Sequence, residues 1–286
     1  MSTKKSLLHL CFWVGLALTF NIGIYIFMGP EKALSFLGGY VIEQSLSLDN
    51  IFLFLLIFES FSIKPEYQKR VLTYGIFGAV VLRLIFIILG VTIIDKFHWM
   101  LYIFGLLLIV SGIKMFFKHN ESKDFHNSKI IKLINKIIPV SKELDGEKFF
   151  TKKNGILYAT PLFAILILIE LSDIIFAIDS IPAIFSITTD PFIVYTSNIF
   201  AILGLRNMYF LLEKLHNKFD YVKYGVACIL IFTGIKLSIT FFHINISIIV
   251  SLLIIFIIMS ASILTSVILN KRKKSPCSSE VSKNII

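Results

Sequence analysis

Carboxylate side chains lie in two long apolar stretches of this sequence, where such groups are rare. The stretches read GYVIEQSLSLDNIF (39–52) and LIELSDIIFAIDSIP (168–182). A charged side chain at the centre of a membrane-spanning helix costs roughly 2.5–3.5 kcal/mol on insertion scales, so several of them indicate a functional site. Polar contacts between helices are the alternative explanation. The carboxylates are Glu43, Asp49, Glu170, Asp173 and Asp179.

The donor atoms of these two stretches are oxygens. The amide of Asn50 and several serine hydroxyls accompany the carboxylates, and neither stretch contains His or Cys. Mg²⁺, Ca²⁺ and Mn²⁺ suit oxygen ligands, whereas Zn²⁺ and copper favour imidazole and thiolate. The carboxylates and Asn50 therefore predict a site for a hard or borderline divalent cation. Without metal, several close carboxylates cannot all stay ionised, so exchange of protons for metal is a natural coupling.

Helical geometry places these residues on shared faces. At 100° per residue, Glu43, Ser47 and Asn50 share one face of their helix. Glu170 and Asp173 share one face of another helix by the same rule. If the two helices cross, their polar faces can converge on one site.

The elements that would position this site follow from composition. Hydrophobic residues make up 56% of the chain and charged residues 16%, and the mean hydropathy is +0.84. These values are typical of an integral membrane protein. Because a span needs about 20 apolar residues and lipid offers backbone groups no partner, we predict an all-α polytopic bundle of about eight spans rather than a barrel. The spans are 7–28, 33–58, 71–94, 98–117, 156–180, 191–213, 221–241 and 246–269.

Basic residues are sorted by side, and this sorting predicts the orientation. If the N-terminus is cytoplasmic, 22 of the 28 Lys and Arg residues fall on the cytoplasmic side and only Lys32 and Lys96 fall outside. This positive-inside bias predicts a multi-pass protein of the inner or plasma membrane with both termini in the cytoplasm. Topology then accounts for the net charge of +10, and no nucleic-acid partner is expected.

The chain repeats itself at an offset near 123. Residues 73–83, TYGIFGAVVLR, match 196–206, TSNIFAILGLR, at five of eleven positions, and Arg83 is matched by Arg206. Each unit has three helices, and the loop between the units starts and ends on one side of the membrane, so the second unit is inverted. Inverted repeats are common in secondary transporters, whose sites lie at the repeat interface. We expect the two arginines to neutralise a carboxylate or to close a gate. For Arg206, which lies near the inner end of its span, a side chain that reaches to the membrane interface is an equal alternative.

Local signals complete the organisation. The loop segment KIIKLINKII (129–138) is predicted to lie as a helix on anionic lipid of the inner leaflet. Pro182 is predicted to end or break its helix beside Asp179, and Asp190–Pro191 to cap the next helix. The units are 1–32 with the N-terminus and first helix, 33–117 as repeat 1, 118–153 as a basic cytoplasmic loop, 156–241 as repeat 2, and 242–286 with the last helix and a basic cytoplasmic tail.

At these residues the chain resembles the TerC family of bacterial membrane proteins, which is named for tellurium resistance and includes the Alx proteins. The resemblance implies an inner-membrane protein of seven to nine spans that exports manganese. The matching pieces are EQSLSLDNIFLF (43–54), ELSDIIFAIDSIPAI (170–184), TDPFIVYTSNIFAILGLRNMYFLL (189–212) and the GIK ends of two helices. The implied metal ligands are Glu43, Asp49, Asp173 and Asp179, with Asn50 as a further candidate.

The function expected from these patterns is export of a divalent cation, most of all Mn²⁺, as a transported substrate rather than a bound cofactor. The main alternative is a membrane scaffold in an envelope-stress or tellurite-resistance complex, without transport of its own. An intramembrane aspartyl protease would need a GxGD context, which neither stretch has, so no enzymatic activity is expected. The expected partners are the cation and the lipid bilayer, and the transport direction, coupling ion and oligomeric state are left open.

Overall fold

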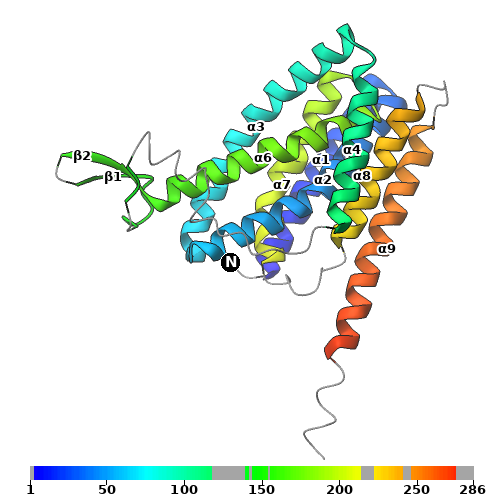
Figure 1. Cartoon of the computed structure of the whole chain (residues 1–286). Helices are drawn as coiled ribbons and strands as arrows, with labels where there is room; N and C mark the ends of the chain where they lie inside the picture. The colour runs from blue at the N-terminus through cyan, green and yellow to red at the C-terminus, as the bar shows by residue number, and fades with distance from the viewer. Residues whose placement is uncertain are drawn as a thin grey trace, which may run out of the picture.

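The computed structural model describes residues 3–117, 139–141, 144–153, 155–213, 222–240 and 246–274, apart from the side chains of Asp49 and of a few residues near the ends of these ranges (Figure 1). In this part of the chain, eight long helices form one bundle, which confirms the predicted all-α membrane fold class. The helices are α1 (Thr3–Met28), α2 (Pro30–Ser60), α3 (Pro65–Lys96), α4 (Met100–Phe117), α6 (Pro161–Phe185), α7 (Pro191–Leu212), α8 (Val222–Ile239) and α9 (Ile248–Lys274).

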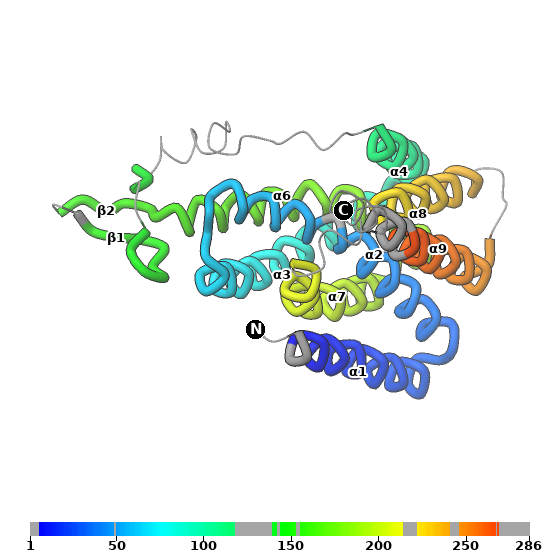
Figure 2. The backbone as a smooth tube through the Cα atoms, turned by 90° about the horizontal axis from the view of Figure 1, so that it is seen from below, coloured from blue at the N-terminus to red at the C-terminus, as the bar shows by residue number. Residues whose placement is uncertain are grey.

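Helix α7 differs from its neighbours in composition. Seven of the eight described helices are long and apolar enough to cross a membrane, and α7 is the exception. It carries Ser197, Asn198 and Asn207, all buried in the bundle. Helix α7 contacts α1, α2 and α3, and Figure 2 shows it between α1 on one side and α2 and α3 on the other. Because these helices shield α7 from lipid, it holds polar side chains that a lipid-facing helix would not.

Helices of the two predicted repeats pack against each other in exchanged pairs. Repeat 1 supplies α2, α3 and α4, and repeat 2 supplies α6, α7 and α8. Helix α2 packs on α7 and α3 packs on α6, while α4 packs on α8 and α2 packs on α6. If the two units are exchanged, α2 takes the place of α6, α3 that of α7 and α4 that of α8, and the same four helix contacts result. A pseudo-twofold axis requires this. The inverted relation of the units stays a prediction.

Helices α4 and α8 approach each other so closely that glycine is required. A Cβ atom added at Gly105 would lie 2.8 Å from the carbonyl oxygen of Gly234, and one at Gly234 would lie 2.6 Å from that of Gly105. A Cβ atom added at Gly112 would lie 2.8 Å from the carbonyl oxygen of Ala227. Gly105 of α4 lies against Gly234 of α8, whereas Gly112, further along α4, lies against the earlier residue Ala227 of α8. The two helices therefore run antiparallel. An inverted repeat requires this direction.

We predicted from the sequence that the fifth span begins at residue 156, and this prediction is wrong. Residues Ile156–Ala159 form strand β2, which pairs antiparallel with strand β1 (Phe150–Lys153), and α6 begins only at Pro161. The hairpin projects from the bundle at the start of α6 (Figure 1). Asn-Gly at 154–155 is a strong hairpin signal, and the interpretation of this region as a plain basic loop overlooked it.

Pro182 does not break its helix, which is a second correction. Helix α6 continues to Phe185, one turn beyond the proline. Proline removes one donor from the helix, but the following amides still bond, and Ser186 donates to the carbonyl oxygens of Pro182 and Ala183. Asp179 therefore keeps helical geometry.

Predictions for the polar ends of the chain lie partly outside the described residues. The KRKK run at 271–274 is the last turn of α9, five residues beyond the predicted end of that span. The tail at 275–286 lies outside the described residues, and so does the segment 129–138. The predicted disorder of the tail and the predicted lipid contact of the segment stay predictions.

The N-terminal end of α7 is capped as the sequence predicts. One oxygen of Asp190 accepts hydrogen bonds from the amides of Phe192 (3.0 Å) and Ile193 (3.3 Å), and Pro191 opens the helix. The other oxygen forms an ion pair with Lys32 in the first turn of α2. Partial burial raises the pKa of Asp190, but the Lys32 and amide contacts outweigh burial and hold this pKa below its usual value.

We predict that Gly234→Ala destabilises the protein, because the new Cβ would strike the carbonyl oxygen of Gly105. Overpacking costs about 1–3 kcal/mol, which exceeds the gain of up to ~1 kcal/mol from Gly→Ala in a helix. Thermal unfolding in detergent measures the change. Gly23→Ala in α1 is the control, since nothing lies within 4 Å of its added Cβ. Equal melting temperatures for the two variants would contradict the contact.

We also predict a pH-dependent stability difference between wild type and Asp190→Asn. Asn retains the cap but loses the ion pair with Lys32. Because the folded-state pKa of Asp190 is lowered, the wild-type advantage is fully present above the unfolded pKa of ~3.9 and is lost as pH falls through the folded pKa. Both side chains are partly exposed, so the advantage should not exceed about 1 kcal/mol. Chemical unfolding across this range tests it, and an advantage that grows with acidification would refute it.

Candidate functional site

A buried arginine, Arg83 of α3, lies at the centre of the charged residues. Its side chain is 1% exposed. Nη1 lies 2.9 Å from Oε1 of Glu43 on α2, while Nε and Nη2 lie 3.3 and 3.4 Å from the two carboxylate oxygens of Asp173 on α6. Nη1 also donates a hydrogen bond to the hydroxyl of Ser180. One guanidinium therefore joins a carboxylate from each predicted repeat, and we call Arg83, Glu43 and Asp173 the arginine network.

A fourth helix supports this network. Asn198 of α7 donates a hydrogen bond from Nδ2 to Oε2 of Glu43 at 3.0 Å. Glu43 and Asn198 are fully buried, and Asp173 is 4% exposed. When both carboxylates are ionised, the single guanidinium leaves the network with an excess of one negative charge. In the low-dielectric interior of the bundle, this excess would attract a further cation.

Glu170, one turn before Asp173 on α6, lies in a notch of α3. The notch is at Gly78, where an added Cβ would lie 2.1 Å from Oε1 of Glu170. Glu170 and Asp173 line a small cavity of about 20 Å³ between α2, α3, α6 and α7, which is room for roughly one water molecule. Oε2 of Glu170 is buried and has no hydrogen-bond partner in the described part of the chain. Glu170 thus offers a carboxylate oxygen that no described group engages.

Other buried oxygens on α2 and α7 also lack partners. Glu43, Ser47 and Asn50 follow one another along α2, and all three are buried, in agreement with their shared helical face. Within the described residues, the Ser47 hydroxyl and the side-chain carbonyl oxygens of Asn50 and Asn198 have no hydrogen-bond partner. Buried polar atoms without a partner are costly and call for an explanation, such as a bound ion or water.

The structure does not gather all of the candidate ligands. Asp179 turns toward α4, where Ser111 donates to its Oδ1 at 2.9 Å and Lys114 is close enough to interact electrostatically. Arg206 is half-buried on α7 and pairs with no described carboxylate. Asp49 belongs to α2, but its side chain lies outside the described part.

A metal ion at the arginine network would therefore need mixed oxygen ligands. Among the described residues, no group of three or more His, Cys, Asp or Glu side chains is placed to hold a metal ion. Amide, hydroxyl or backbone oxygens would have to complete the coordination of a divalent cation, which takes six or more ligands when it is Ca²⁺ or Mg²⁺.

Three residues of the site were missed in the sequence. Asn198 is an amide inside an apolar run, which is the signal that selected Asn50. Ser180 directly follows Asp179, and its hydroxyl was not selected because attention went to the neighbouring carboxylate. Gly78 ends the sequence GIFG in α3, but no sequence signal shows which side chain occupies the space that it leaves.

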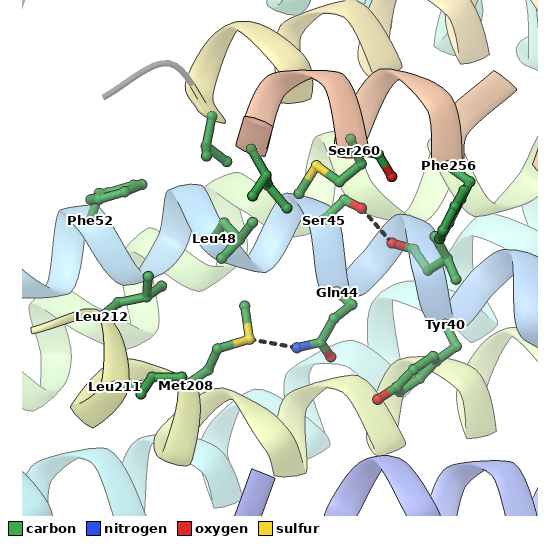
Figure 3. A pocket seen from close by; sticks show the side chains of 14 residues that line it. Tyr40, Gln44, Ser45, Leu48, Phe52, Met208, Leu211, Leu212, Phe256 and Ser260 are labelled. Atoms are coloured by element: carbon green, nitrogen blue, oxygen red, sulfur yellow. Dashed lines mark hydrogen bonds between the residues drawn. The ribbon is translucent and has the colours of Figure 1, made fainter. Parts of the chain in front are cut away.

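A larger cavity, shown in Figure 3, is lined by residues other than those of the arginine network. Its volume is about 420 Å³, and its almost wholly apolar walls come from α2, α7, α8 and α9. Gln44 lines it and donates a hydrogen bond to Sδ of Met208, as Figure 3 shows. Gln44 points about 100° around α2 from Glu43. Because an apolar wall cannot coordinate a cation, this cavity does not suit a cation.

Fold and site together define a polytopic helical membrane protein with a charged network buried among four of its helices. Residues 28–274 match the family described as "Integral membrane protein TerC family". The chain belongs to the TerC family, and the resemblance found in the sequence is confirmed.

Similar proteins come from several bacteria. "Uncharacterized membrane protein STKORF319" of Myxococcus xanthus is 46% identical over 275 residues, which cover 96% of this chain and 85% of that protein. "Putative membrane-bound redox modulator Alx" of Escherichia coli is 45% identical over 281 residues, covering 95% of this chain and 87% of the relative. An "Uncharacterized membrane protein" of Rickettsia bellii is 48% identical over 239 residues, covering 84% of this chain and 79% of that protein. No solved structure matches the chain.

We predict that Asn198→Ala destabilises the protein, because it removes the hydrogen-bond donor from Oε2 of Glu43. An unsatisfied buried acceptor costs about 1–3 kcal/mol, and more when it is charged. Chemical unfolding in detergent measures the loss. Ser197→Ala is the control, since Ser197 is equally buried but donates to Val194 of its own helix. In a Glu43→Gln background the cost of Asn198→Ala should shrink, and fully additive effects would contradict the contact.

Proposed function

We propose that this TerC-family protein exports a divalent cation, most of all Mn²⁺, across the cell membrane. The observation that carries the proposal is the arginine network, whose buried carboxylates come from both predicted repeats. Its excess negative charge and the unpartnered oxygens nearby favour a cation as the substrate. The proposed ligands are drawn from Glu43, Asp49, Asn50, Glu170, Asp173 and Asp179.

Ligand chemistry supports a hard or borderline ion. The described side chains of the site present carboxylate, amide and hydroxyl oxygens, which Mg²⁺, Ca²⁺ and Mn²⁺ accept. Among these ions, the family resemblance favours Mn²⁺. The relatives named Alx are called redox modulators, but carboxylate, amide, hydroxyl and guanidinium groups do not exchange electrons. The described site therefore gives a redox role no support.

Transport requires the site to face each side of the membrane in turn. Two inverted repeats around a site at their interface would allow this motion. With both termini cytoplasmic, as the basic residues predict, export moves the ion away from the basic loops. Carboxylates that release metal would take protons, so proton exchange is the proposed coupling. A non-transporting scaffold is the competing function, and no enzymatic step is proposed.

Reconstitution tests the proposed function. Proteoliposomes that contain only this protein should transport Mn²⁺, and protein-free vesicles should not. Asp173→Asn keeps the side-chain shape but loses the charge, so transport should fall by at least roughly tenfold, the factor that one hydrogen bond to a charged group represents. Glu66→Gln, at an exposed carboxylate in the first turn of α3, is the control and should transport normally. A folded wild-type protein that moves no divalent cation would favour the scaffold.

A second variant separates the site from the fold. Gly78→Ala should push the Glu170 carboxylate out of its notch and weaken Mn²⁺ binding. Because that carboxylate ends a flexible side chain, it can turn away, and the free energy of unfolding should change by less than about 1 kcal/mol. Gly75→Ala on the same helix is the control, since its added Cβ meets nothing closer than 3.5 Å. Calorimetric titration with Mn²⁺ is the measurement, and undiminished binding by Gly78→Ala would remove Glu170 from the ligands.

A further inference from the structure

We propose that Arg83 is a built-in substitute for the transported cation, whose guanidinium takes the position between Glu43 and Asp173 whenever the metal ion has left. The inference rests on the proposed function and gives this arginine a role in it. Metal ion and guanidinium then compete for the same two carboxylates, and each transport cycle displaces one by the other.

The contacts of Arg83 are those that a bound cation would make. Its nitrogens lie 2.9 Å from one oxygen of Glu43 and 3.3–3.4 Å from both oxygens of Asp173. A divalent ion held by the same carboxylates would lie about 2.0–2.6 Å from their oxygens, and so inside the space that the guanidinium fills. Two cations at such short separation repel strongly in a low-dielectric interior. The metal ion therefore binds only as Arg83 moves away.

Charge balance explains why such a substitute is useful. Without any cation, the carboxylates of Glu43 and Asp173 would have to take up protons or stay ionised and uncompensated inside the bundle, and the second state is strongly unfavourable. A guanidinium keeps its charge at any physiological pH, so Arg83 compensates one of these two charges whether or not protons are available. The metal-free binding site can then turn from one side of the membrane to the other without carrying a metal ion back. Net export depends on this return step, whereas one-for-one metal exchange does not.

The carboxylate contacts of Arg83 differ in length. Charge-assisted N–H···O bonds are typically about 2.7–2.9 Å long. The contact with Glu43 falls in this range, but both contacts with Asp173 are longer, so Asp173 holds the guanidinium less firmly than Glu43 does, while the Ser180 hydroxyl of α6 accepts a further hydrogen bond from Nη1. The small cavity beside Asp173 borders the same side of the network. An ion that arrives at Asp173 therefore meets the weaker of the two attachments.

The test measures binding and two modes of transport in Arg83→Gln. Loss of the internal competitor should tighten Mn²⁺ binding to the purified protein by at least about tenfold, the factor that one charge-assisted hydrogen bond represents. In vesicles, exchange of internal for external radioactive Mn²⁺ should continue, while net efflux into metal-free buffer should fall by at least about tenfold for the same reason. Arg70→Gln is the control on the same helix, since Arg70 pairs with Glu147 at the surface and should leave all three measurements unchanged.

Further variants keep the test decisive if Arg83→Gln does not fold. Arg83→Lys retains a charge but not the planar fork, and should bind Mn²⁺ more tightly than wild type, by a smaller factor. The charge-balanced double variant Arg83→Gln/Glu43→Gln should bind more tightly than Glu43→Gln alone. Unchanged or weaker binding in the folded arginine variants overturns the proposal, and so does loss of exchange together with net efflux. A folded wild-type protein that neither binds nor moves a divalent cation overturns the proposed function itself, without reference to any arginine variant.

Discussion

Charge inside a bundle that lipid surrounds is costly unless it is paired within the protein, and the contact of Arg83 with Glu43 and Asp173 supplies such pairing. Its three members come from three different helices, so the pairing holds only while α2, α3 and α6 keep their relative positions. Buried ion pairs are seldom more stabilising than apolar residues of the same volume. Stability alone therefore does not explain their presence here.

The surrounding helices are shaped by what this network needs. Asn198 supplies a donor to Glu43 from α7, and α1, α2 and α3 pack around the helix that carries this amide. On the other side, Gly78 leaves the space in which the Glu170 carboxylate lies. A larger residue at this position, or a more apolar α7, would change the polar site before it changed the fold.

Much of the fold could be predicted from sequence, because long apolar runs, the Asp190–Pro191 cap and the buried face of α2 follow from local rules. The separate environment of Asp179 was also within reach, since six residues beyond Asp173 correspond to about 240° around the helix. By contrast, the pairing of Arg83 with Asp173 depends on how two helices are aligned, which local rules do not determine. The hairpin before α6 was missed because its Asn-Gly signal lies within a basic segment.

The contact between Gly105 and Gly234 has a mechanical consequence. Beside the backbone contact, the side chains of Ile109, Leu237 and Ser238 fill the remaining space, and a second close contact lies about two turns away at Gly112. Helices α4 and α8 come from opposite halves of the molecule, so these contacts set the distance between the halves. Two such contacts along one helix pair would make α4 and α8 move together as a single strut that joins the halves.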